Sequence, residues 1–442
     1  MNITTRMDHA AVPIGAPNVV HVLIAITAPD QTTGKPRPPL NLAAVIDRSG
    51  SMEGKKLESA KESLRLLLDQ LAPVDRFSLV AFDNEVLPLV EGVLAKDKTE
   101  IREVIDRIQA CGSTNLSGGW VKGIELADRK AKPDQVNAVL LLTDGQANQG
   151  IVDRAQLIAI GENIHKEKAI RTTCLGLGAD FNEDLLKDIA TNAGGRFYYI
   201  ETPDQAPEVF KEELGGLLAV TAQNVELELT ATDGVSDIAH LTGYKWKNDN
   251  KTCRILLGDF HAQQVKHVLL ALQLPALTDV TDMHLATMRL TYAELKDGAV
   301  DIKSQKRDLV IRVVKTVDPQ ETADPEVLLH IALQRAATAR KEAVEQIDKG
   351  DINAATKVLE NRRDQILRMA EKTSEPARVQ SEAEELTRRA TELRETHDVG
   401  ESRKFMVAEG TSMSQVQFCA TESARYRRSQ NQQSRRKTGN KA

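Results

Sequence analysis

Aromatic residues are scarce in this chain, at 3% of its 442 residues. A hydrophobic core must therefore be built mainly from Leu, Val, Ile and Ala. Apolar residues make up 41% of the sequence and charged residues 28%, which is typical of a soluble globular protein. The length is sufficient for two or three domains.

Cysteine is also scarce, and its positions form no motif. Cys111, Cys174, Cys253 and Cys419 are far apart in the sequence. This spacing excludes the common zinc-binding and disulfide patterns and favours reduced thiols in a cytosol. The nine histidines form no HExxH-type cluster either.

Long apolar runs and a strong charge imbalance are absent as well. No run approaches the ~18 apolar residues of a membrane span. The N-terminal stretch "MNITTRMDHAAVPIG" has no charged start followed by an apolar segment, so we expect no secretory signal. A net charge of -6 argues against a general nucleic-acid binder. We therefore expect a cytoplasmic protein that binds neither a membrane nor a specific nucleic acid.

Strand and helix patterns alternate between residues 40 and 218. "NLAAVI" (41–46) and "AVLLL" (138–142) are the near-continuous apolar runs of parallel strands that are buried on both faces. Residues 55–71 place leucines at spacings of three and four, as in an amphipathic helix. This alternation predicts a doubly wound, Rossmann-like α/β domain over residues 40–218.

The flanking segments have different patterns. Strands without intervening helices predict an antiparallel β-sandwich over residues 219–318, and we expect one strand within residues 1–39 to join it. The α/β domain would then be inserted in the sandwich. Residues 319–397 predict a helical hairpin or bundle. Residues 398–442, which end in "RYRRSQNQQSRRKTGNKA", predict a largely disordered basic tail.

Oxygen-bearing side chains follow the apolar strands. "AAVIDRSGSMEG" places Asp47, Ser49 and Ser51 after one strand, "LLTDGQANQG" places Asp144 after another, and "CGSTNLSGG" places Thr114 in a Gly- and Ser-rich loop. Ligands of open α/β sheets bind at the carboxyl ends of the strands, so we expect these five side chains to meet at one edge. A simple turn remains the alternative for the first stretch. Oxygen ligands suit a hard cation, Mg²⁺ first, although they also admit Mn²⁺ and Ca²⁺.

The three motifs, in this order, resemble the von Willebrand factor type A family, in which they form a metal-ion-dependent adhesion site. "DRFSLVAF" and "GLGADFNEDLLKDIATNAGGRFYYI" are also similar to that family. The flanking strands resemble bacterial and inter-alpha-trypsin-inhibitor-like members. The resemblance implies that Ser49, Ser51 and Thr114 bind the cation through hydroxyls, and that Asp47 and Asp144 bind it directly or through water. The Gly-Gly-Thr loop of most members reads Gly-Ser-Thr in this chain.

The resemblance implies a binding function rather than catalysis. In the family, a Glu or Asp of a protein partner completes the metal shell, which predicts a metal-dependent interaction module or scaffold. One alternative is a regulatory subunit of an ATPase complex. A Mg²⁺-dependent hydrolase is less favoured, because Ser49 stands where an aspartyl phosphatase needs a second Asp, and the three loops hold no histidine as general base. Trp120 has two interpretations, a partner contact and a core residue, of which core packing is favoured.

Overall fold

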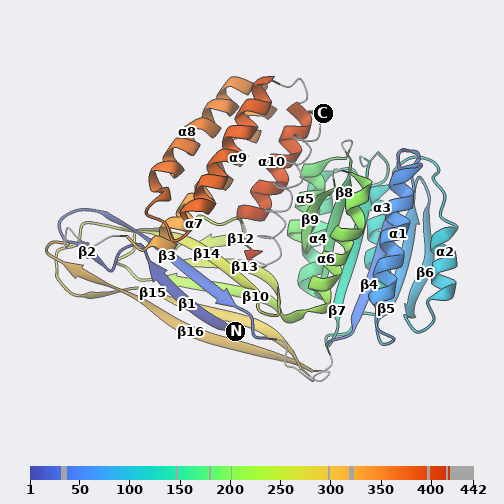
Figure 1. The fold of residues 1–442 in the computed structure, drawn as a ribbon. Coiled ribbons are helices and arrows are strands. Elements are labelled where there is room, and N and C mark those ends of the chain that lie inside the picture. The colour runs from blue at the N-terminus through green and yellow to red at the C-terminus, as the bar shows by residue number, and fades with distance from the viewer. Residues whose placement is uncertain are drawn as a thin grey trace.

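The structure of the chain is a computed structural model. It describes residues 1–30, 37–145, 148–178, 181–200, 202–296, 299–317, 323–395, 399–414 and 417–418. Figure 1 shows an α/β sheet covered by helices and, beside it, a pair of long sheets that are antiparallel except where β2 (Ala11–Pro13) pairs with β16 (Ala299–Val314). A group of C-terminal helices lies over these antiparallel sheets and reaches the α/β part. No helix in the described ranges is long and apolar enough to cross a bilayer.

The α/β part is built on a six-stranded sheet with the strand order β6-β5-β4-β7-β8-β9. Its strands are β4 (Leu40–Asp47), β5 (Arg76–Phe82), β6 (Val86–Leu94), β7 (Val136–Thr143), β8 (Ile170–Leu177) and β9 (Gly194–Ile200). Neighbouring strands are parallel except in the β5–β6 hairpin. The predicted doubly wound fold is confirmed, and the carboxyl ends of β4, β7 and β8 lie at one edge.

Helices cover both faces of this sheet because successive side chains of a strand point to opposite faces. Leu42 and Ala44 of β4 belong to the core formed with α1, α2 and α6, whereas Ala43 and Val45 belong to the core formed with α3, α4 and α5. The helices are α1 (Lys55–Gln70), α2 (Thr99–Asp106), α3 (Leu116–Asp128), α4 (Arg154–Lys168), α5 (Glu183–Asn192) and α6 (Ala206–Leu218).

Two further sheets share one hydrophobic core, to which Val22 and Ile24 of one sheet and Leu227 and Leu229 of the other belong. The first sheet contains β1 (Asn2–Met7), β3 (Asn18–Thr27), β14 (Val265–Leu274), β11 (Asp237–His240) and β17 (Gln417–Phe418). The second contains β12 (Lys245–Asp249), β13 (Thr252–His261), β10 (Val220–Ala231), β15 (Asp282–Lys296), β16 (Ala299–Val314) and β2 (Ala11–Pro13). Because β3 pairs with β14, segments from before and after the α/β part lie in the same sheet.

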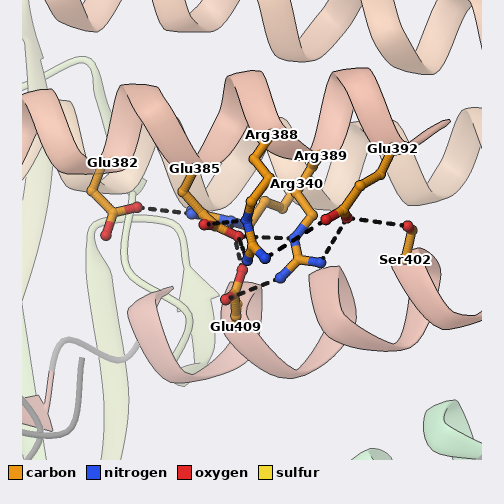
Figure 2. A network of polar contacts seen from close by, with 8 residues as sticks. All are labelled: Arg340, Glu382, Glu385, Arg388, Arg389, Glu392, Ser402 and Glu409. Carbon is orange, nitrogen blue, oxygen red and sulfur yellow. Dashed lines mark hydrogen bonds and ion pairs between the residues drawn. The ribbon is translucent and has the colours of Figure 1, made fainter. Parts of the chain in front are cut away.

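The predicted C-terminal helical region is confirmed. It contains α7 (Pro325–Asp348), α8 (Ile352–Ala370), α9 (Pro376–Glu395) and α10 (Val399–Ser414). Small side chains such as Ala336 and Ala339 lie in its core and let the helices approach closely. Figure 2 shows a network of ion pairs and hydrogen bonds between α7, α9 and α10, formed by Arg340, Glu382, Glu385, Arg388, Arg389, Glu392, Ser402 and Glu409.

Helix α10 lies where the sequence analysis expects the start of a largely disordered tail, and that expectation is wrong for residues 399–414. Tertiary contacts account for the difference. Arg403 pairs with Glu183 of α5 and with Asp348 of α7, so α10 bridges the helical region and the α/β part. A local sequence pattern does not reveal such partners. The part of the tail after residue 418 lies outside the described residues.

Buried charges connect the α/β part to the antiparallel sheets. Arg171 of β8 and Asp259 of β13 form an ion pair at 3.2 Å between Nη1 and Oδ2. Next to them, the amine of Lys266 on β14 donates hydrogen bonds to the carbonyl oxygens of Leu257, at 2.6 Å, and Asp259, at 2.8 Å. Burial, together with the nearby arginines Arg196 and Arg171, lowers the pKa of Lys266 to about 7, against the attraction of Asp259.

We expect the stability of this junction to rise with pH above neutrality. As the pH rises above 7, the amine of Lys266 loses its proton in the folded state, whereas the unfolded amine stays protonated up to about pH 10. The unfolded state then binds more protons, so the free energy of unfolding increases by at most about 1.4 kcal/mol per pH unit in this window. Between pH 7.5 and 9.5, wild type should gain about 2–3 kcal/mol relative to Lys266→Met in urea unfolding.

An exposed lysine provides the control for this pH dependence. Lys96→Met removes an amine from an exposed position and should leave the pH dependence of wild type unchanged. If the free energy of unfolding changed with pH in the same way for wild type and Lys266→Met, the expectation would be contradicted.

Candidate metal site

The first part of the site is the end of β4 and the turn that follows it. Asp47 is the last residue of β4, and its side chain is fully buried. Its Oδ1 accepts a hydrogen bond from the backbone N–H of Ser49 at 2.8 Å, and its Oδ2 accepts one from the hydroxyl of Thr143 at 2.5 Å. The chain then turns through the short 3₁₀ helix Gly50–Met52, which carries Ser51.

The second part is the end of β7, where Asp144 follows the last strand residue and is also fully buried. Its Oδ1 accepts a hydrogen bond from the hydroxyl of Ser51 at 2.7 Å, and the Oγ atoms of Ser51 and Ser49 are 3.1 Å apart. Its Oδ2 accepts one from the amine of Lys56 at 2.5 Å. Asp144 therefore joins the loop after β7 to the loop after β4.

The third part is the loop before α3, which carries Thr114. Asn115 caps α3 by accepting a hydrogen bond from the N–H of Gly118, so the helix begins directly after this loop. A Cβ atom added to Gly145 would lie 2.9 Å from Thr114 Oγ1 and 3.6 Å from Asp47 Oδ2. Both side chains therefore approach the same glycine, where a larger residue has no room. The five residues named from the sequence gather at one edge of the sheet.

The chemistry of this group fits a divalent cation. Burial, together with the charge of Asp144, raises the pKa of Asp47 to about 6, against the hydrogen bonds from Ser49 and Thr143. Two buried carboxylates in one place are costly unless positive charge offsets them. Hard cations prefer oxygen ligands such as these. Within the described ranges, no three His, Cys, Asp or Glu side chains are grouped to hold a metal, so hydroxyls would have to supply several of the ligands.

Two contacts were missed by the sequence reasoning. The Thr143 hydroxyl donates a hydrogen bond to Asp47 and so orients its carboxylate. The sequence did offer a signal for this role, because Thr143 directly precedes Asp144 at the end of an apolar strand. Lys56 contacts Asp144 from the first turn of α1, which no motif indicates. Trp120 is fully buried and its indole N–H donates to the Thr172 hydroxyl at 3.0 Å, in agreement with core packing.

Sequence comparisons connect this architecture to a known family. A model described as von Willebrand factor type A domain matches residues 41–212. A second model of the same description matches residues 255–373, which form β13–β16 and α7–α8 in the structure. An uncharacterized protein from Synechocystis is 30% identical over 69% of this chain and 74% of its own length. Inter-alpha-trypsin inhibitor heavy chain H4 from Homo sapiens is 30% identical over 47% of this chain, which spans only 23% of that protein.

Solved structures with the same fold extend over nearly the whole chain. A von Willebrand factor type A protein from Catenulispora acidiphila has a TM-score of 0.66 and 17% identity, covering 94% of this chain and 97% of its own. The ArnB paralog VWA2 from Sulfolobus acidocaldarius has a TM-score of 0.60 and 20% identity, covering 93% of this chain and 97% of its own. At these identities the likeness concerns the fold. Together with the family model and the Synechocystis relative, it leads to one conclusion: the chain belongs to the von Willebrand factor type A domain family.

Proposed function

We propose that the chain is a metal-dependent protein-binding module, in which a divalent cation at the carboxyl edge of the α/β sheet binds a Glu or Asp side chain of a partner. The observation that carries this proposal is the gathering of two buried carboxylates and three hydroxyls from three separate loops. Hydroxyl ligands add no negative charge. A cation in this site would therefore retain affinity for one more anionic oxygen.

The ligand set that we propose for the cation contains carboxylates and hydroxyls only. Mg²⁺ is the metal that we propose, because it prefers hard oxygen ligands and keeps positions open for other oxygens. The cation would supply the electrophilic contact for the partner's carboxylate. The proposed ligands are Asp47, Ser49, Ser51, Thr114 and Asp144.

The proposal includes a division of labour along the chain. In this proposal, residues 40–218 form the metal site. Residues 1–39 and 219–318 form the β-sheets that support the α/β part. The helices within residues 319–397 offer a second surface for partner contacts. We propose a cytoplasmic binding protein without catalytic activity. The three loops that form the site hold no histidine that could serve as a general base.

Metal binding by the purified protein is the first test. We expect wild type to bind Mn²⁺, measured by calorimetry and by the loss of the free-ion electron paramagnetic resonance signal. Asp47→Asn should lower the Mn²⁺ affinity by about 100-fold or more, because it removes a charged ligand. The amide keeps the size of the side chain: its oxygen can accept the hydrogen bond of the Ser49 N–H, and its NH2 group can donate one to the Thr143 hydroxyl.

An exposed carboxylate provides the matched control. Asp204, in the short 3₁₀ helix Pro203–Gln205, has a side chain 69% exposed and pairs with Lys55. Asp204→Asn should bind Mn²⁺ as wild type does. Absence of Mn²⁺ binding by wild type, or equal binding by Asp47→Asn, would contradict the metal-site proposal.

Partner binding is tested with the same variants. Affinity purification of tagged wild type in Mg²⁺ should retain proteins that are lost both in EDTA and with Asp47→Asn. Proteins retained under every condition would assign binding to the helices or the antiparallel sheets, and would contradict metal-dependent docking.

A further inference from the structure

Lys56 contacts the candidate metal site directly, although it is not among the five residues named from the sequence motifs. Its Nζ lies 2.5 Å from Oδ2 of the buried Asp144, and its own side chain is 26% exposed. The neighbouring Lys55 points elsewhere and pairs with Asp204, with 69% of its side chain exposed. Of these two adjacent lysines, Lys56 is the one that reaches the site.

The requirements of helix α1 do not explain this position. Lys56 is the second residue of α1, and the positive end of the helix dipole disfavours cations in the first turn. A Cβ atom added to Gly178, at the end of β8, would lie 3.6 Å from the Lys56 Cε atom. The lysine therefore passes over the backbone at the end of β8 to reach Asp144. Its ion pair with Asp144 is the interaction that accounts for this path.

The two site carboxylates differ in the charge of their partners. Asp47 accepts hydrogen bonds from neutral donors, the N–H of Ser49 and the hydroxyl of Thr143. Asp144 accepts one from a hydroxyl and one from the Lys56 ammonium. With both carboxylates ionised, Lys56 leaves the site with one negative charge instead of two.

We propose that Lys56 sets the charge of the metal site, so that a divalent cation binds with moderate affinity and the loaded site keeps a net positive charge. The inference rests on the proposed metal-binding function of the same site. Opposite charges in a poorly solvated site interact strongly, and so do like charges. Without Lys56, the cation would be neutralised by the two carboxylates. With it, one positive charge remains to attract the partner's carboxylate, so metal binding and partner binding reinforce each other.

The test is a Mn²⁺ titration of wild type, Lys56→Met, Lys56→Arg and Lys55→Met, read by calorimetry and by the free-ion resonance signal. Lys56→Met should bind Mn²⁺ about tenfold or more tightly than wild type, because a cation that competes for Asp144 is removed. Lys56→Arg keeps the charge and should keep the wild-type affinity. Lys55→Met makes the same change in net charge at an exposed position and should also bind as wild type does.

Thermal unfolding provides a second readout. Without metal, Lys56→Met should melt at a lower temperature than wild type, because Asp144 keeps its buried charge without a cationic partner. Mn²⁺ should raise the melting temperature of Lys56→Met more than that of wild type. Damage to the site without a change of charge would weaken Mn²⁺ binding, so tighter binding cannot arise from misfolding.

The outcomes separate this inference from the proposed function. If wild type binds Mn²⁺ and Lys56→Met binds it equally or more weakly, the role of Lys56 is overturned while the metal site stands. Equal tightening by Lys55→Met would also overturn it, since the effect would then come from net charge alone. If wild type binds no Mn²⁺, both proposals fail.

Discussion

Replacing Arg340 by alanine is expected to lower the free energy of unfolding by about 3–5 kcal/mol, the range for removal of one partner from a buried ion pair. Arg340 lies on α7 with 1% of its side chain exposed. Its Nη2 is 2.8 Å from Glu382 Oε2 on α9, and its Nε is 3.4 Å from Glu409 Oε2 on α10 (Figure 2). One guanidinium therefore connects three helices.

The size of this effect comes from the charges that are left behind. Glu382 has only 10% of its side chain exposed, so water cannot replace the lost guanidinium fully. The truncation also leaves a cavity between the helices, since arginine packs with its aliphatic part as well as with its charge. Urea unfolding followed by far-ultraviolet circular dichroism measures the change.

An exposed ion pair in the same region provides the control for Arg340→Ala. Arg394 of α9 pairs with Glu360 of α8 at 2.8 Å, but 55% of the arginine side chain is exposed. Arg394→Ala should cost less than about 1 kcal/mol, as exposed pairs do. If Arg340→Ala and Arg394→Ala lowered the free energy of unfolding equally, burial of the ion pair would not determine its contribution to stability, and the prediction would be wrong.

Replacing Trp120 by alanine is expected to destabilise the α/β part by about 3–5 kcal/mol. The indole is fully buried in the core between α3, α4, α5 and the sheet. A Cβ atom added to Gly161 on α4 would lie 3.4 Å from Trp120 Cη2, which places the ring against that helix. Truncation would leave a large cavity and remove the indole N–H that donates a hydrogen bond to the Thr172 hydroxyl.

The loss of Trp120 should also weaken Mn²⁺ binding, because α3 starts two residues after Thr114 and would be held less firmly. The neighbouring residue on the same helix provides the control. Val121 is 39% exposed, and Val121→Ala should change stability by less than about 1 kcal/mol and leave Mn²⁺ binding unchanged. A Trp120→Ala protein as stable as Val121→Ala would contradict the core assignment.

Local patterns were sufficient to predict the α/β fold. The apolar runs at 41–46 and 138–142 lie in strands β4 and β7, in which every residue is buried, as parallel strands covered on both faces require. Leu57, Leu64, Leu67 and Leu68 line the buried side of α1. Such patterns are visible in the sequence because burial on one or two faces constrains residues that are close along the chain.

Helix α10 was not predictable in the same way. Its residues Arg403 and Lys404 contact the α/β part, where Arg403 pairs with Glu183 and Lys404 donates to the carbonyl oxygen of Phe181 at 2.8 Å. These partners are more than two hundred residues earlier in the chain. Without them, the segment reads as a charged, solvated tail.

The sequence by itself determined that Asp47 and Asp144, each at or directly after the end of an apolar strand, lie at one edge of the sheet. The carboxyl ends of parallel strands share one edge, so residues directly after β4 and β7 must lie near each other whatever the rest of the chain does. Only the tertiary structure decided how their charges are balanced. Lys56 reaches Asp144 from a different element, and Arg340 connects three helices through space. Ion pairs of this kind depend on distances between segments that packing sets, and sequence spacing carries no record of them.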